Sequence, residues 1–257
     1  MLTPIPPRIG LEICVDSAAG LLAAAENGAD RIELCAALSE GGLTPSQGMM
    51  QMASNVSKPV RAMIRPRAGN FIYVGGELDI MRRDIEASAA CGLEGVVLGC
   101  NDASGNLDEE AMAALVGHAH AFELKVTLHR SFDLVRDPEH ALNVAADLRI
   151  DTILTSGLQN TALEGLELIA QLVQLARKTN VQIMAGSGVM PSTAAALIKR
   201  SGVSFVHASC RRPHSHSCES TAHLHMTPHR ETDPMLIAQL RRALDALHDR
   251  KSVGVDA

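Results

Sequence analysis

The sequence predicts a single (β/α)8 TIM barrel, because short apolar segments alternate with helical segments along the whole chain. The eight apolar, β-branched runs begin near Leu11, Arg31, Val60, Gly95, Lys125, Thr152, Gln182 and Ser204. Each run is followed by a polar or glycine-rich turn and then by a helical pattern. Eight such units in 257 residues fit the usual size of this barrel, about 250 residues. An open doubly wound sheet is the alternative, but no G-x-G-x-x-G follows the first strand.

The chain is expected to form one domain over residues 1–257, because no linker or change of composition divides it. Residues 1–10 are expected to be an N-terminal extension. Residues 208–232 are expected to be an irregular segment, rich in His and Cys, that precedes the last helix.

The first two expected strands, residues 11–15 and 31–35, each carry a glutamate followed two residues later by a cysteine. These residues are Glu12, Cys14, Glu33 and Cys35. A strand has a period of two, so the glutamate and cysteine of each strand share a face. Residues 17–27 between them are helical in character. We therefore expect parallel neighbours, with Glu beside Glu and Cys beside Cys.

Later elements follow the same logic. Helical spacing of apolar residues predicts helices over residues 77–91 and 164–179. Pro138 and Pro191 stand where a helix would begin, a position that proline tolerates. Residues 60–65 alternate between apolar and polar or charged side chains, which is typical of a strand with two different faces.

The outer face of a barrel packs under helices and must be apolar, so the polar face of each strand should line the interior. The polar side chains expected to converge there are Glu12, Cys14, Glu33, Cys35, Arg65, His129 and His207. For Glu12, the deepest, we expect a structural role, paired with Arg61, Arg65 or Lys125.

Two loops after strands could hold an anion. Residues 65–77, R-P-R-A-G-N-F-I-Y-V-G-G-E, bring Arg65 and Arg67 over the barrel mouth. In A-G-S-G-V-M-P-S, Gly186 and Gly188 would let the backbone approach a ligand just before a helix. We predict an anion site at these four residues; solvated surface loops and an ordinary glycine turn are the alternatives.

Composition excludes several classes of function. The net charge is −6 with no block of like charge, and the chain has no Trp, one Tyr and four Phe, so a nucleic-acid surface is not expected. No apolar run approaches the ~20 residues of a membrane span, and the N-terminus lacks a signal-peptide pattern. We expect a cytoplasmic protein without a membrane partner, whose six cysteines are free thiols or metal ligands.

Several longer motifs occur together and in order. They are L-E-I-C, G-A-D-R-I-E-L-C, S-E-G-G-L-T-P-S, I-R-P-R-A-G, L-H-R-S-F-D, L-T-S-G and M-A-G-S-G-V. With them the chain resembles the CutC family, called copper homeostasis proteins, from about Leu11 to His207. The resemblance implies a cytoplasmic TIM barrel, usually a homodimer or higher homo-oligomer, associated with copper handling. It also implies that Cys14 and Cys35 match the cysteines proposed as copper ligands.

Three site hypotheses follow. First, thiolates are soft ligands that select Cu(I), so Cys14 and Cys35 could bind copper, although two neighbouring carboxylates would raise the pKa of each thiol. Buried packing cysteines are the alternative.

Second, Glu33, His129 and Asp133 could supply acid–base groups to an enzyme acting on a small anionic, phosphorylated metabolite. A Schiff-base aldolase is not expected, because the only strand lysine, Lys125, lies away from the mouth.

Third, the His- and Cys-rich segment could bind zinc or copper, or could simply be a surface loop. Its residues of interest are His207, Cys210, His214, His216, Cys218, His223, His225 and His229. Their spacing does not match a tetrahedral zinc finger, so the indication is one of composition.

Overall fold

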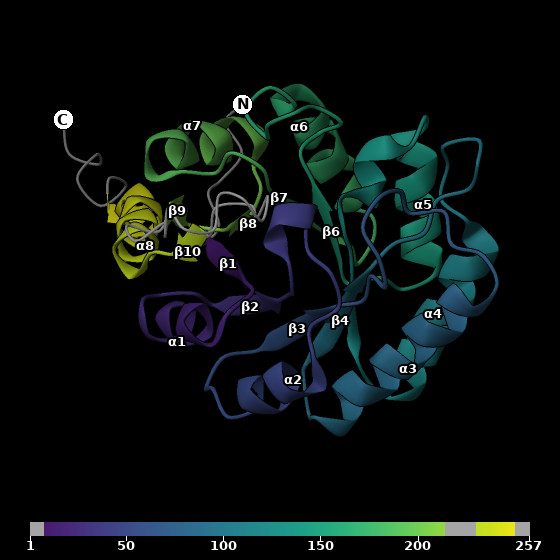
Figure 1. Cartoon of the computed structure of the whole chain (residues 1–257). Helices are drawn as coiled ribbons and strands as arrows, with labels where there is room; N and C mark the ends of the chain where they lie inside the picture. The colour runs from purple at the N-terminus through teal and green to yellow at the C-terminus, as the bar shows by residue number, and fades with distance from the viewer. Residues whose placement is uncertain (1–7, 214–229, 250–257) are drawn as a thin grey trace, which may run out of the picture.

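The computed structural model describes residues 8–213 and 230–249, and its central feature is a closed barrel of eight parallel strands in sequential order (Figure 1). The strands are β1 (Gly10–Val15), β2 (Arg31–Leu34), β3 (Val60–Met63), β4 (Gly95–Leu98), β5 (Lys125–Leu128), β6 (Thr152–Thr155), β7 (Gln182–Ala185) and β8 (Phe205–Ala208). β8 pairs with β1 and closes the sheet. The predicted (β/α)8 barrel is therefore confirmed.

Helices surround the barrel, and their bounds agree with the sequence pattern. They are α1 (Ala18–Glu26), α2 (Gln47–Ala53), α3 (Gly76–Ala90), α4 (Glu109–Ala121), α5 (Pro138–Asp147), α6 (Leu166–Ala176), α7 (Pro191–Ser201) and α8 (Pro234–Asp249). Two short 3-10 helices, η1 (Leu38–Glu40) and η2 (Arg130–Leu134), follow β2 and β5. Pro138 and Pro191 are the first residues of α5 and α7, as predicted.

The two faces of the strands divide as expected. Apolar side chains such as Ile13 and Ala62 are fully buried in the main core between the sheet and the helices. Arg61 lies on the other face of β3, is buried, and donates hydrogen bonds to Thr127 and Thr152. Its guanidinium also pairs with Glu94, 2.8 Å away. The interior of the barrel is thus a hydrogen-bonded polar core.

The register between β1 and β2 differs from the expected one. Cys14 pairs with Glu33, and Glu12 pairs with Arg31. The prediction of Glu beside Glu and Cys beside Cys was therefore wrong by two residues. A closed barrel staggers neighbouring strands along their axes, and a stagger of two residues keeps each side chain on its face while it changes its neighbour.

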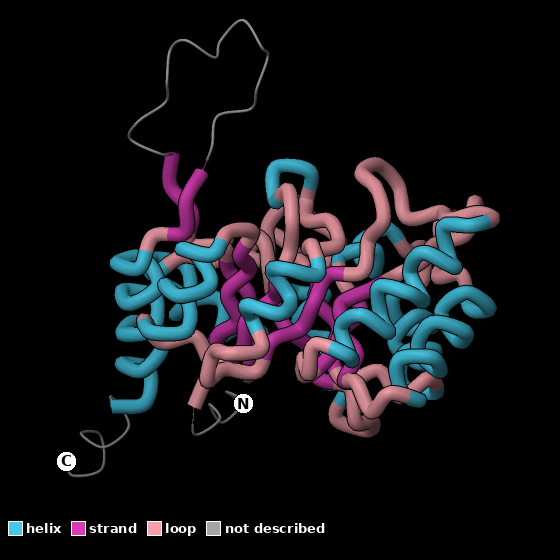
Figure 2. The backbone as a smooth tube through the Cα atoms, turned by 60° about the horizontal axis from the view of Figure 1, so that its bottom comes forward, coloured by secondary structure: helices cyan, strands magenta, loops and turns pink. Residues whose placement is uncertain are grey.

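A short antiparallel pair, β9 (Arg211–Pro213) and β10 (Arg230–Thr232), follows the barrel and projects from its rim (Figure 2). Residues 214–229 of the predicted His- and Cys-rich segment lie outside the described residues. α8 follows β10 and packs beside α7 and α1. Within residues 8–213 and 230–249, no helix combines the length and hydropathy that crossing a bilayer requires.

Candidate functional site

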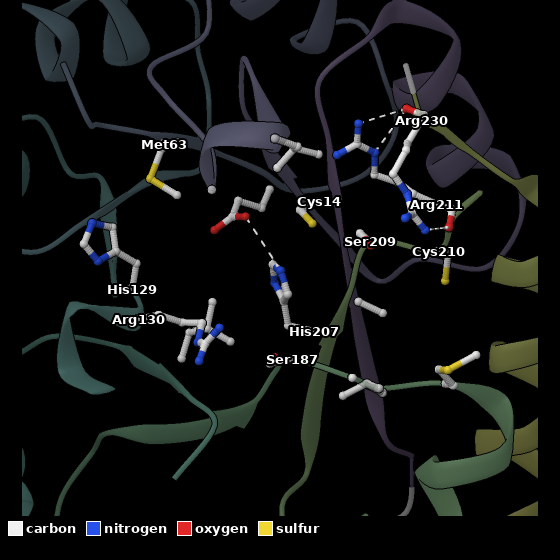
Figure 3. A pocket seen from close by; sticks show the side chains of 18 of the residues that line it. Cys14, Met63, His129, Arg130, Ser187, His207, Ser209, Cys210, Arg211 and Arg230 are labelled. Atoms are coloured by element: carbon white, nitrogen blue, oxygen red, sulfur yellow. Dashed lines mark hydrogen bonds and ion pairs between the residues drawn. The ribbon is translucent and has the colours of Figure 1, made fainter. Parts of the chain in front are cut away.

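A cavity of about 450 Å³ opens at the carboxyl ends of the strands (Figure 3). Side chains from β1, β2, β3 and β8 reach it, together with residues of the loops after β3, β5 and β7. The predicted site residues that line it are Cys14, Glu33, Arg65, His129, Gly188, His207 and Cys210. This is the end of the barrel at which enzymes of this fold carry their active sites.

Three of these side chains form a compact cluster. One ligand atom each from Cys14, Glu33 and His207 lies within 4.8 Å of the other two. The His207 ring is fixed by Glu12, whose Oε1 lies 2.8 Å from Nδ1. The other ring nitrogen, Nε2, is 3.8 Å from Glu33 Oε2.

Buried charges around the cluster perturb its protonation equilibria. Burial opposes ionisation of Glu12, but Arg31 and His207 outweigh it and lower the pKa of Glu12 to about 2. Burial is the main cause that raises the pKa of Glu33. For His207, burial disfavours the cation, yet the charges of Cys14 and Glu33 raise its pKa well above the usual value. Glu12 therefore stays ionised and holds a cation on each side.

Cys35 lies beside this cluster. Its Sγ donates a weak hydrogen bond to Glu33 Oε2 over 3.6 Å, and its side chain packs with Met63 and Val97. Burial, and then the Glu33 charge, raises the pKa of Cys35 well above its usual value. The thiol form of Cys35 is therefore favoured, as the sequence argument about neighbouring carboxylates anticipated.

The two arginines predicted to bind an anion are occupied by their own loops. Arg65 Nη1 donates to the carbonyls of Glu40 and Gly42, 2.7 and 2.9 Å away, and its Nη2 donates to Gly69 over 2.9 Å. Arg67 forms an ion pair with Glu77 and does not line the cavity. Both guanidinium groups hold the backbone around the mouth, and an anion-binding role for them stays a prediction.

The two predicted glycines differ. Gly188 lines the cavity with a φ of +72°, a conformation that favours glycine. Gly186 is tightly packed against Leu154, because a Cβ added at Gly186 would lie 2.5 Å from Leu154 Cδ1. The backbone therefore approaches the cavity at Gly188, while Gly186 allows close packing between neighbouring strands.

Asp133 is held by side-chain and backbone donors and is not among the residues that line the cavity. It accepts hydrogen bonds from Thr155 Oγ1 over 2.5 Å and from the N–H groups of Ser156 and Leu158. Arg130 donates to its other oxygen over 2.7 Å. These contacts join η2 to the loop after β6, and an acid–base role for Asp133 is an untested prediction.

His129 lies on the cavity wall and is buried. Its Nδ1 accepts the backbone N–H of Ser131 over 3.1 Å. Burial, with the nearby Arg65 charge, lowers the pKa of His129 to about 3, so the ring is neutral.

Sequence reasoning missed Arg31, the buried partner of Glu12. Arg31 stands at the first position of β2 and was read only as the start of a strand. Its alternation with Glu33 and Cys35 would have placed it on the inner face. Glu12 was expected to pair with Arg61, Arg65 or Lys125; it pairs with Arg31 instead, because the two-residue stagger places these two residues side by side.

The sequence model of the CutC family matches residues 9–212. The chain belongs to the CutC family. A family protein CutC from Sinorhizobium medicae is 46% identical over 242 residues, which cover 93% of this chain and 98% of the relative. The solved CutC structure from Streptococcus agalactiae, named for copper homeostasis, is 30% identical with a TM-score of 0.74, covering 78% of this chain and 98% of that one.

The barrel is also similar to more distant structures. N-(5'-phosphoribosyl)anthranilate isomerase from Pyrococcus furiosus superposes with a TM-score of 0.57 at 15% identity, covering 93% of this chain and 99% of that one. At this identity the likeness concerns the fold alone.

Proposed function

We propose that this CutC protein binds Cu(I) in the barrel mouth, with Cys14 and His207 as its principal ligands, and that this binding serves copper homeostasis. The observation that carries the proposal is the buried cluster of Cys14, Glu33 and His207, with ligand atoms within 4.8 Å of one another. Sulfur and imidazole nitrogen are donors that suit copper. The name of the Streptococcus agalactiae relative, a copper homeostasis protein, points to the same metal.

The surroundings of His207 favour a ligand role. Glu12 contacts Nδ1, so that nitrogen keeps its proton, and Nε2, which lies toward Glu33, is the nitrogen that would give up its proton to bind a metal. A carboxylate that orients a ligating histidine in this way is a common support of protein metal sites. When bound there, the metal would replace a proton of the His207 cation, so binding should release protons.

Cys35 remains a proposed ligand from the sequence analysis, in second place. Its thiol is close enough to Glu33 to donate to it, but Cys35 is outside the three-residue cluster. A metal would have to displace its strongly held proton. Cys14 and Cys35 should therefore contribute unequally.

The test is Cu(I) affinity of the untagged protein, measured by competition with a chromogenic Cu(I) chelator, for the wild type and for the Cys14→Ser and Cys35→Ser variants. We expect Cys14→Ser to weaken binding by at least about 100-fold, and Cys35→Ser by about tenfold or less. Cys91→Ser is the matched control, since Cys91 ends α3 far along the chain from the cluster.

Unchanged affinity in Cys14→Ser would exclude the cluster. Zn²⁺ also accepts sulfur, nitrogen and oxygen donors, so a parallel titration with Zn²⁺ is needed. Tighter binding of Zn²⁺ than of Cu(I) would contradict the choice of metal. The cytoplasmic location and the homo-oligomeric state expected from the sequence stay predictions.

A further inference from the structure

His129 is held rigidly at the end of β5. Its Nδ1 accepts the N–H of Ser131 at the start of η2. Gly99, after β4, leaves room for the ring, because a Cβ there would lie 2.8 Å from His129 Nδ1 and 2.1 Å from Ser131 Oγ. Phe71 packs on the ring with centroids 4.7 Å apart. The orientation of the imidazole is therefore set from three sides.

This arrangement fixes the tautomer. A neutral imidazole carries one proton, and Nδ1 accepts the Ser131 N–H, so the proton is on Nε2. The Nε2 atom is buried and has no hydrogen-bond partner among the described residues. Leaving a buried donor unpaired is unfavourable by about 1–3 kcal/mol. His129 lines the cavity, so a ligand whose acceptor reaches Nε2 would satisfy this donor.

The charges nearby favour an anion. The Arg65 guanidinium lies over the Phe71 ring, 5.0 Å from its centroid, and its Nε is also buried, with no hydrogen-bond partner in the described part of the chain. Arg130 lines the cavity with a side chain that is 42% exposed, and its guanidinium pairs with Asp133, 2.7 Å away. Figure 3 shows His129 and Arg130 on one side of the cavity, apart from His207 and Cys14. An acceptor oxygen placed there would meet a donor close to the Arg65 charge.

We propose that the cavity binds a small organic anion, whose carboxylate or phosphate oxygen accepts a hydrogen bond from His129 Nε2. The rest of the wall is largely apolar, with Leu154, Val189 and Met190 available to a short carbon skeleton. A volume of about 450 Å³ is in the range of small-molecule sites. His129 is not a member of the cluster of Cys14, Glu33 and His207, so the proposal does not depend on copper binding.

The test uses metal-free, full-length protein and three probes: inorganic phosphate, propionate, and propionamide as the uncharged control. Long-range ¹H–¹⁵N NMR of the wild type should show the Nε2–H tautomer of His129. Its Nε2 resonance should shift saturably with phosphate or with propionate. The anion that binds more tightly shows whether the natural ligand carries a phosphate or a carboxylate. Propionamide should produce no comparable shift.

Two variants separate a ligand role from a structural one. Gln places an amide near the position of Nε2, whereas Asn places its oxygen near Nδ1 and can still accept the Ser131 N–H. We expect His129→Gln to retain the affinity for the bound anion within about threefold, and His129→Asn to lose at least tenfold. If His129 had only a structural role, His129→Asn should retain the affinity for the anion and His129→Gln should lose it.

The proposal is overturned if neither anion shifts the wild-type Nε2 resonance saturably, or if His129→Asn binds as well as the wild type. Because the wild-type titration needs no substitution, a variant that fails to fold does not remove the test. Cu(I) affinity is expected to be unchanged in a folded His129→Gln protein, so failure of this site and failure of the metal site are distinguishable.

Discussion

Glu12 is a fully buried carboxylate that holds two cations, Arg31 and His207. Arg31 pairs with it from the neighbouring strand, and His207 contacts it from β8 across the barrel closure. An isolated charge at this depth would be very unfavourable, so each member of the trio is stable only with the others. The same contacts orient His207 toward Cys14 and Glu33, and the structural trio therefore supports the proposed metal site.

Replacing Glu12 with Gln should lower the free energy of unfolding by about 3–5 kcal/mol at pH 7, because Arg31 and His207 lose their anion. The pKa of Glu12 is about 2 when folded, against a usual 4.5, so the folded state favours the carboxylate. Its contribution is therefore complete above about pH 4.5 and is lost as the pH falls toward 2.

Urea denaturation of metal-free protein at pH 7, 4 and 3 measures this effect. The difference in the free energy of unfolding between the wild type and Glu12→Gln should become smaller at the two lower pH values. Glu86→Gln, at an exposed position on α3, is the control and should change stability little. If the difference in the free energy of unfolding stayed constant from pH 7 to pH 3, the Glu12 carboxylate would not be the group that stabilises the fold.

The loops around the mouth are held by the guanidinium groups of two arginines rather than by regular structure. Arg65 leaves the end of β3 and ties η1 and Gly42 to the following loop at Gly69. Arg67 fixes the same loop to Glu77 at the start of α3. These contacts explain why arginines that the sequence places over the mouth need not be available to an anion.

Substituting Arg65 with Met should leave three carbonyl groups without their donor, and we expect a loss of about 1–3 kcal/mol in stability. Amide hydrogen exchange should accelerate in residues 38–42 and 68–70, with little change in the strands. Hydrogen-exchange mass spectrometry checks this, with Arg82→Met as the exposed control. Equal exchange in the two variants would show that Arg65 does not hold these loops.

At the scale of the whole molecule, α8 completes the ring of helices where the chain returns to β1. Its Ile237, Leu240 and Leu244 are fully buried, and Arg241 donates to the carbonyl of Ile9 over 2.9 Å. Arg241 also pairs with Asp30, 3.0 Å away. The last helix is thus fastened to the two strands that carry Glu12 and Glu33 (Figure 1).

Leu240→Ala should destabilise the barrel by about 2–5 kcal/mol, since it opens a cavity between α8 and the sheet. Leu22→Ala is the matched control, because Leu22 on α1 is 45% exposed and should change stability by less than about 0.5 kcal/mol. Far-UV circular dichroism during urea unfolding measures both. A Leu240→Ala protein as stable as the control would mean that α8 does not contribute to the core.

Local sequence patterns were sufficient to predict the faces of the strands and the starts of helices. Alternation along residues 60–65 separated the outer face from Arg61 and Arg65, and proline placed the starts of α5 and α7. Such features depend on neighbours within a few residues, so the sequence contains the information directly. The same reasoning placed Cys14, Glu33, Arg65 and His129 at the mouth, where they now line one cavity.

Contacts between distant residues were decided only by the tertiary structure. The stagger of the closed barrel sets Cys14 beside Glu33, and closure of β8 onto β1 brings His207 to both. Likewise, whether Arg65 is free or bonded to carbonyls depends on loops 23 to 25 residues away. Side-chain period determines the face on which a residue lies, but the shear of the barrel determines its neighbour, and shear is a property of all eight strands together.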